Sequence, residues 1–374
     1  MSISRLQCLP QNLIVWGRDA IAKELAKLGD NGIERPIIFT VDQLAEFSQQ
    51  SVAPFLSDAV GTFLDLRAHA PDVDIRKGLE VCQSLGARSI VALGGGSVLD
   101  GAKAVSHFHF QATGQYLPIV ALPTTLSGSE FSHYFGITET GGEQRFKRSY
   151  AVRDTVPRIV ILDPVLLLNT PRQLLLSSAI KGIDHAVEGM RQVPVDHPHA
   201  VMAADGVNRF FSVLQRWPEG LEIDEALRQR IVSWDDIQQL QLAAWHCYFS
   251  PASVIYGLSH RIGHILGGTY QVPHSVTSCI TLAPVIRACA PFYADRLDVF
   301  RVAQAASSAA VVLADRISAL VTALELPTQL RDFGLKESQL PEIAALLQDK
   351  YPVEVADLGK DSASKLEHLL RSLF

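Results

Sequence analysis

The run SIVALGGGSVLDGAKAVSHF, residues 89–108, decides the fold of the first half of this chain. It passes from an apolar strand pattern through Gly94, Gly95, Gly96 and Ser97 into a helical pattern. Without side chains at the turn, backbone N–H groups can approach an anion closely, and the positive end of the following helix favours negative charge. The turn therefore predicts a site for a pyrophosphate-bearing cofactor. Its spacing is neither G-x-G-x-x-G nor a Walker loop, so an ordinary tight turn is the alternative.

Short apolar runs alternate with amphipathic segments up to about residue 165. The expected strands are LIVWG at 13–17, PIIFT at 36–40, VGTFLDL at 60–66, RSIVAL at 88–93, PIVALP at 118–123 and RIVILD at 158–163. This alternation is typical of a parallel sheet covered by helices. After Asp163-Pro164 the patterns are helical, as in DIQQLQLAAWHCYF. We expect an α/β domain over 1–164 and an all-helical domain over 165–374.

Composition excludes several classes of protein. A formal net charge of -6 and the absence of any long basic run argue against a nucleic-acid partner. Five scattered cysteines without a Cys-x-x-Cys pair fit a reducing cytoplasm. We see no secretion signal and no apolar run near the roughly 20 residues that cross a bilayer. We expect a cytoplasmic protein that binds no membrane.

Further cofactor contacts are predicted beyond the glycine turn. Asp42 follows the second strand, where a carboxylate accepts hydrogen bonds from a ribose diol and repels a 2′-phosphate, which favours NAD over NADP. The alternative is that Asp42 caps a helix. The loop LPTTLSGSEFSHYFGITE, 122–139, is rich in hydroxyls and follows the fifth strand. It supplies Thr124, Thr125, Ser127 and Ser129 as candidate contacts, with an ordinary polar loop as the alternative. Lys147 could reach the same ligand or remain a solvated surface lysine.

Histidines mark the second half. His260 and His264 are four apart and share a helix face, and Gly267-Gly268 ends that helix so that His274 can return to the same site. Imidazoles converging in this way suit a divalent ion. His185 adds a fourth imidazole on a helical segment. Four other histidines, His107, His109, His197 and His199, lie in polar or loop-like sequence and are expected at the surface.

Lys181 lies one turn before His185, so the two side chains should share a helix face. An ammonium has no lone pair to offer a metal and would repel one. Asp184 points about 100° away from His185 and is a poor substitute ligand. Lys181 could instead stabilise charge on a substrate oxygen, with His264 as proton donor or relay, bind a substrate carboxylate, or extend to solvent.

These motifs resemble the iron-containing (group III) alcohol dehydrogenase superfamily over nearly the whole chain. The matching segments are GGGSVLDGAK from Gly94, PTTLSGSE from Pro123, HAVEG from His185 and the His-x3-His-x9-His pattern from His260. The shortened Thr-Thr loop is most similar to the maleylacetate reductase branch. The resemblance implies a Rossmann-like NAD(P)-binding domain with Asp100 in its motif, a helical domain of the dehydroquinate synthase-like type, and a homodimer.

Two departures from the family pattern matter. Metal-dependent members carry an aspartate at the position of Lys181, which with His185, His260 and His274 completes the metal shell. The C-terminal Asn-Pro-Arg-Pro stretch of the maleylacetate branch is replaced here by YPVEVADLGKDSASKLEHLL. We therefore expect a metal-free NAD-dependent reductase, with NADP less suited, acting on a small oxo- or hydroxy-carboxylate. A dehydroquinate synthase-like lyase and a non-catalytic nucleotide-binding protein are the alternatives.

Overall fold

The structure is a computed structural model, and it describes residues 5–141, 146–300 and 308–374. The chain forms two compact units. The sheet unit comprises Cys8–Pro171 with Ser233–Gln241, and the helical unit comprises Met1–Gln7, Arg172–Val232 and Leu242–Phe374. No described helix is both long and apolar enough to span a bilayer.

All six predicted strands form one parallel sheet, in the order β1-β8-β5-β4-β2-β3. Their bounds are β1 Leu13–Trp16, β2 Pro36–Phe39, β3 Gly61–Phe63, β4 Ser89–Gly94, β5 Ile119–Pro123 and β8 Ile159–Leu162. Every residue of β2, β4, β5 and β8 is buried. Burial on both faces explains why these strands read as continuous apolar runs in the sequence.

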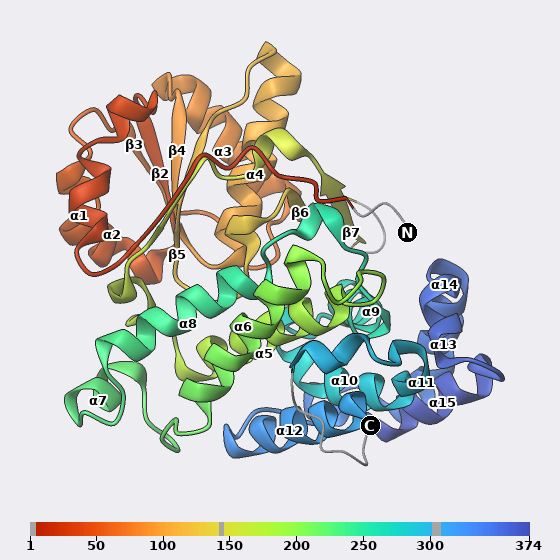
Figure 1. Cartoon of the computed structure of the whole chain (residues 1–374). Helices are drawn as coiled ribbons and strands as arrows, with labels where there is room; N and C mark the ends of the chain where they lie inside the picture. The colour runs from red at the N-terminus through yellow and green to blue at the C-terminus, as the bar shows by residue number, and fades with distance from the viewer. Residues whose placement is uncertain (1–4, 142–145, 301–307) are drawn as a thin grey trace. The chain divides into compact units, whose positions relative to one another are not determined.

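Helices cover both faces of this sheet (Figure 1). The helices of the sheet unit are α1 Ala20–Leu25, α2 Ala45–Ser51, α3 Asp72–Leu85 and α4 Gly96–Thr113. Side chains of α1, such as Ile21, share one core with Ile38 and Val91 of the strands. On the other face α3 packs so closely that a Cβ at Gly78 would lie 3.1 Å from the Phe63 ring. The expected α/β fold is therefore confirmed for this half.

An antiparallel hairpin was not predicted. Its strands are β6 Tyr134–Glu139 and β7 Phe146–Ala151, paired from Tyr134 with Ala151 to Glu139 with Phe146. The hydroxyl-rich composition of residues 122–139 led to a loop prediction for the segment that contains β6. Its Tyr-Phe-x-Ile-Thr pattern suits a strand, because aromatic and β-branched residues fit a pleated surface.

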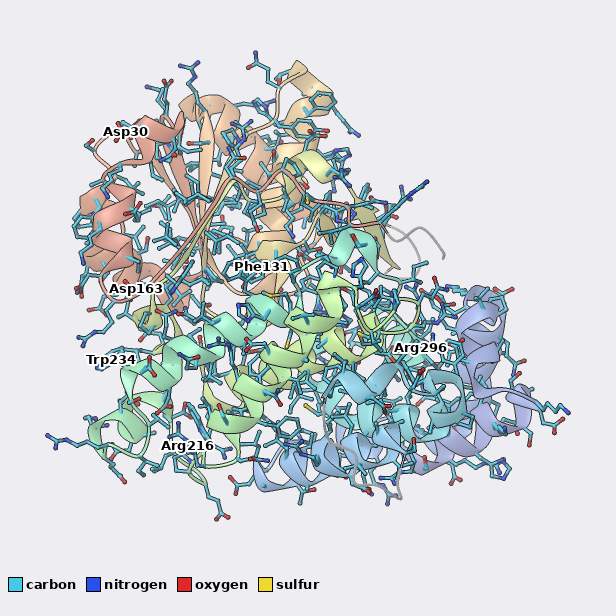
Figure 2. All side chains as sticks on the ribbon, in the orientation of Figure 1. Asp30, Phe131, Asp163, Arg216, Trp234 and Arg296 are labelled. Atoms are coloured by element: carbon cyan, nitrogen blue, oxygen red, sulfur yellow. The ribbon has the colours of Figure 1, made fainter. Side chains whose placement is uncertain are left out.

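Asp163, which is labelled in Figure 2, directly follows β8 and forms hydrogen bonds to several elements of the sheet unit. Its carboxylate accepts hydrogen bonds from the backbone N–H of Val165 at 3.2 Å and of Ile21 at 3.3 Å. Its carbonyl accepts one from Gln241 Nε2 at 3.0 Å. These bonds explain why residues 233–241, which include the first part of helix α8 (Trp234–Cys247), belong to the sheet unit.

The rest of the chain is helical, as expected. Its helices are α5 Arg172–Gly189, α6 Pro198–Leu214, α7 Ile223–Arg228, α8 Trp234–Cys247, α9 Leu258–Tyr270, α10 His274–Ala288, α11 Ala290–Tyr293, α12 Ala309–Ala323, α13 Leu340–Lys350, α14 Pro352–Val355 and α15 Ser362–Ser372. Helix α5 is central, because every residue from Leu175 to Gly189 is buried. A buried charge is costly unless it is paired, so the ionisable residues of α5 require partners.

Candidate active site

The glycine turn of the sheet unit lies between β4 and α4, as predicted. β4 ends at Gly94, Gly95 precedes the helix, and α4 begins at Gly96. A Cβ on Gly95 would lie 2.8 Å from Thr125 Cγ2, and one on Gly96 would lie 3.4 Å from Ser127 Oγ. The hydroxyl-rich loop after β5 therefore closes onto the turn, and Thr125 and Ser127 hydrogen-bond to each other at 3.1 Å. The structure brings these candidate contacts together.

The other candidates in this unit have partners within the fold. Ser97 Oγ accepts a hydrogen bond from the His69 backbone N–H at 3.1 Å. The Asp100 carboxylate accepts from Ser129 Oγ at 2.7 Å and from the Gly136 N–H at 3.1 Å. Thr124 is buried, and its carbonyl accepts from Thr170 Oγ1 at 2.5 Å. Asp100 thus fixes the loop and β6 to α4.

A buried lysine in α4 was missed by the sequence reasoning. Lys103 is fully buried and donates to the Ser129 carbonyl at 2.6 Å and the Tyr134 carbonyl at 3.0 Å. Burial lowers the pKa of Lys103 to about 8 against the attraction of Asp100 and Glu130. Burial raises the pKa of Glu130 to about 7. The GGGSVLDGAK motif therefore contains a residue that stabilises the loop from inside the fold.

Asp42 is exposed and begins the short 3-10 helix Asp42–Leu44 directly after β2. The alternative that it caps a helix is wrong, because Val41 occupies the cap position and no side chain makes the capping bond. Lys147 pairs with Thr138 in the hairpin. The Lys147 side chain lies outside the described residues.

In the helical unit, Lys181 projects from α5 into the protein interior. Its Nζ donates to Asp184 Oδ2 at 2.8 Å and to His260 Nδ1 at 3.0 Å. Lys181 is 2% exposed and Asp184 is 0% exposed. The alternative in which Lys181 extends to solvent is therefore wrong, because a buried carboxylate holds its ammonium inside the unit.

Asp184 lies closer to the histidines than expected. The prediction considered only its angle to His185, whereas residues three apart, such as Lys181 and Asp184, are neighbours on a helix surface. Asp184 Oδ2 also accepts from Ser278 Oγ at 2.8 Å and lies 3.8 Å from His260 Nδ1. Burial alone raises the pKa of Asp184, but Lys181 outweighs it and the pKa ends below its usual value. Asp184 therefore stays ionised opposite Lys181.

The four predicted histidines converge within the helical unit. Ring centroids are 5.6 Å apart for His185 and His260, 4.7 Å for His260 and His264, and 5.8 Å for His264 and His274. Burial, followed by the Lys181 ammonium, holds the pKa of both His185 and His260 well below its usual value. These two imidazoles are therefore neutral near pH 7.

Aromatic rings pack against the histidines, and the sequence reasoning missed them. Tyr248 stacks on His185 with centroids 4.0 Å apart, and Tyr256 stacks on His260 at 4.7 Å. Tyr351 lies 6.4 Å from His264. Tyr351 begins the segment that replaces the Asn-Pro-Arg-Pro stretch, and this departure from the family pattern was the one signal in the sequence that pointed to it.

Glu188 of the HAVEG motif is a second residue that was missed. Its carboxyl accepts from the His260 backbone N–H at 3.1 Å and from the Tyr293 hydroxyl at 2.9 Å. Burial and the charge of Asp184 raise the pKa of Glu188 to about 8. His260 lies in the first turn of α9, where backbone N–H groups lack partners within the helix. Glu188 therefore fixes the helix that carries His260 and His264.

The expectation that His197 and His199 lie at the surface is wrong. His197 is 4% exposed and His199 is 0% exposed. His197 begins α6, where its Nδ1 accepts from the His199 backbone N–H at 3.1 Å, and its Nε2 donates to the Arg5 carbonyl at 3.1 Å. These two hydrogen bonds offset the cost of burying the His197 ring, and the Arg5 carbonyl is distant in the sequence.

A metal ion can be tested against these side chains. His260, His264 and His274 offer nitrogens that lie within 4.8 Å of one another, so distance alone would allow an ion. However, His260 Nδ1 accepts a hydrogen bond from Lys181, so the neutral ring carries its hydrogen on Nε2 and has no lone pair left for a metal. The hydrogen bond from Lys181 to His260 and the positive charge of the ammonium both oppose metal binding, although the distances between the histidine nitrogens would permit it. The donor set does not fit a catalytic metal.

Comparisons with known proteins agree with this architecture. Two sequence families match the chain: "Iron-containing alcohol dehydrogenase" over residues 11–164 and "Fe-containing alcohol dehydrogenase family, C-terminal" over residues 223–358. Maleylacetate reductase from Pseudomonas aeruginosa is 29% identical over 340 residues, which cover 91% of this chain and 90% of that protein.

Solved structures show the same fold. Iron-containing alcohol dehydrogenase from Corynebacterium glutamicum superposes with a TM-score of 0.82 at 23% identity, covering 100% of this chain and 97% of that one. Sulfoacetaldehyde reductase from Bifidobacterium kashiwanohense, solved in complex with NAD+, gives 0.80 at 19% identity, with 100% and 99% covered. The chain is an oxidoreductase, and it belongs to the iron-containing alcohol dehydrogenase family.

Proposed function

We propose that this protein is an NAD-dependent reductase that transfers hydride from nicotinamide to the carbonyl carbon of a small oxo-carboxylate, without a catalytic metal. The maleylacetate reductases among its relatives support the substrate class. The NAD+ complex of sulfoacetaldehyde reductase, together with the glycine turn between β4 and α4, supports the cofactor. Asp42 at the end of β2 supports NAD over NADP.

The observation that carries the proposal is the position of Lys181. An ammonium can donate three hydrogen bonds, and Lys181 donates two, to Asp184 and His260, within the described part of the chain. We propose that the third N–H donates to the carbonyl oxygen of the substrate. As hydride reaches the carbonyl carbon, negative charge develops on that oxygen, and a buried cation stabilises it. Asp184 holds the Lys181 Nζ in place through the 2.8 Å hydrogen bond before substrate arrives.

The developing alkoxide also needs a proton. His264 lies beside His260, the ring that accepts from Lys181, so we assign His264 as the donor or relay. Hydride and proton together convert the carbonyl into an alcohol and NADH into NAD+. The substrate carboxylate remains a second candidate partner for Lys181, because an ammonium also binds carboxylates.

NADH oxidation with maleylacetate and related oxo-acids tests this function. We expect turnover that survives prolonged chelation and is not raised by added Fe2+ or Zn2+, with substoichiometric metal in the active protein. Stoichiometric metal that is needed for turnover would contradict the metal-free mechanism. Consumption of an oxo-acid without net NADH oxidation would instead indicate the lyase alternative.

We further propose a homodimer that acts on small molecules and has neither a nucleic-acid nor a membrane partner. Light scattering on the purified protein measures the dimer directly. A monomeric mass in solution would contradict it.

A further inference from the structure

The strand order locates the point where a ligand enters the sheet unit. From β2 the chain moves outward to β3, then returns to β4 on the other side of β2 and continues to β5 and β8. In open parallel sheets, ligands bind at the carboxyl ends of the strands where the direction reverses in this way. The glycine turn follows β4 and Asp42 follows β2. The adenosine ribose of a dinucleotide is therefore expected beyond the ends of β2 and β3.

Two cationic side chains belong to this same edge. Val41 and Asp65 form an isolated bridge, so Asp42 lies beside the segment that leaves β3. That segment contains Arg67, and its His69 N–H donates to Ser97 in the glycine turn at 3.1 Å. Lys77 projects from α3 toward Asp65. A 2′-phosphate at this place would require such cations.

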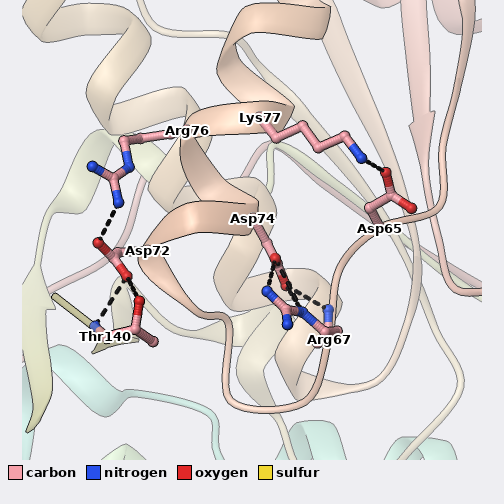
Figure 3. Close-up of polar contacts among 7 residues, drawn as sticks. All are labelled: Asp65, Arg67, Asp72, Asp74, Arg76, Lys77 and Thr140. Carbon is pink, nitrogen blue, oxygen red and sulfur yellow. Dashed lines mark hydrogen bonds and ion pairs between the residues drawn. The ribbon is translucent and has the colours of Figure 1, made fainter. Parts of the chain in front are cut away.

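Both cations are already paired with carboxylates of the protein (Figure 3). Lys77 Nζ donates to Asp65 Oδ2. Arg67 donates to Asp74 through Nη2 at 2.5 Å, through Nε at 3.0 Å and through its backbone N–H at 3.0 Å. Asp74 is 5% exposed, so the Arg67 guanidinium is held against a buried acid although its own side chain is 66% exposed.

We propose that Asp65 and Asp74 are coenzyme-selectivity residues, which hold Lys77 and Arg67 in internal ion pairs so that neither cation can bind a ribose 2′-phosphate. Together with Asp42 they make this edge favour NAD(H) over NADP(H). The inference rests on the proposed function and adds residues to its selectivity. The Asp42 carboxylate would repel a ribose 2′-phosphate, whereas Asp65 and Asp74 occupy the two cations, Lys77 and Arg67, that could otherwise attract it.

Fluorescence titration of NADH and NADPH tests the inference on the full chain. The principal variant is Asp65→Asn, because Asp65 is half-exposed and its loss does not threaten the fold. We expect the NADPH Kd to fall about three- to tenfold, as repulsion is lost and Lys77 is freed, with the NADH Kd nearly unchanged. Adding Lys77→Gln to Asp65→Asn should reverse the gain. Asp74→Asn is a second variant, with circular dichroism as a check on folding.

Glu34→Gln is the matched control. It removes the same charge from an exposed pair, with Arg88 at 2.8 Å, but Glu34 and Arg88 precede β2 and β4 and so lie at the opposite edge of the sheet. Normal NADH binding with unchanged NADPH affinity in Asp65→Asn would overturn the inference alone. A gain that survives Lys77→Gln, or that Glu34→Gln reproduces, would also overturn it. Failure of every protein to bind either nucleotide would defeat the proposed function as well.

Discussion

Replacing Lys181 with methionine separates its catalytic role from its structural one. Lys181 Nζ and Asp184 Oδ2 are 2.8 Å apart and both side chains are buried. At an effective dielectric constant near 20, their gross attraction is about 6 kcal/mol. Desolvation offsets much of this, and breaking one side of a buried pair typically costs about 3–5 kcal/mol. We expect Lys181→Met to lose about that much free energy of unfolding, because it leaves the Asp184 carboxylate buried with Ser278 as its remaining donor.

The double variant Lys181→Met/Asp184→Asn removes the unpaired charge. It should recover most of the lost stability in urea unfolding, while kcat for NADH-dependent reduction stays about 100- to 1000-fold below that of the parent protein. NADH affinity should be unchanged, because the predicted cofactor contacts belong to the sheet unit. A folded double variant with parental kcat would refute the catalytic role of Lys181.

Asp357→Asn provides the matched control for stability. Asp357 forms another buried ion pair in the helical unit, with Arg191 at 2.6 Å. This variant should lose stability to a similar degree and keep its kcat. If Asp357→Asn lowered kcat as much as the Lys181 variants, loss of activity would merely report a weakened fold.

Three further outcomes are expected. Burial raises the pKa of Glu130 from 4.5 to about 7. The contribution of the protonated Glu130 carboxyl to the free energy of unfolding is therefore fully present below about pH 4.5 and is lost as the pH rises through about 7. Glu130→Gln should therefore raise the free energy of unfolding by up to about 3 kcal/mol near pH 8 and by little near pH 4.5; equal effects at both pH values in urea unfolding would contradict this. Glu188→Ala leaves two buried donors, the His260 N–H and the Tyr293 hydroxyl, without an acceptor, so it should lower the free energy of unfolding by about 2–4 kcal/mol. Glu188→Gln should lower it much less, and equal losses in the two variants would argue against the hydrogen-bonding role. Gly95→Ala places a Cβ 2.8 Å from Thr125 Cγ2, so it should weaken NADH binding about tenfold or more while the circular dichroism spectrum stays unchanged. Unaltered NADH affinity would exclude the turn as the coenzyme site.

Local patterns in the sequence determined the parallel strands, the glycine turn and the helical second half. Strands such as β4 and β5 are buried on both faces, so their apolar runs could be recognised without knowledge of the fold. The four-residue spacing of His260 and His264 likewise predicted that they lie on one helix face. Each of these features depends only on residues that are close together in the sequence.

Tertiary structure decided the partners of the polar side chains. His260 meets Lys181 only because α5 packs against α9, and Glu188 meets Tyr293 across 105 residues of sequence. The burial of His199 and the stacking of Tyr248 on His185 also depend on such packing. The sequence by itself determined that a lysine stands one turn before His185, where the family resemblance implies an aspartate in metal-dependent members. The packing of the helices decided that Lys181 and Asp184 are buried together, because neighbouring helices exclude solvent from both side chains.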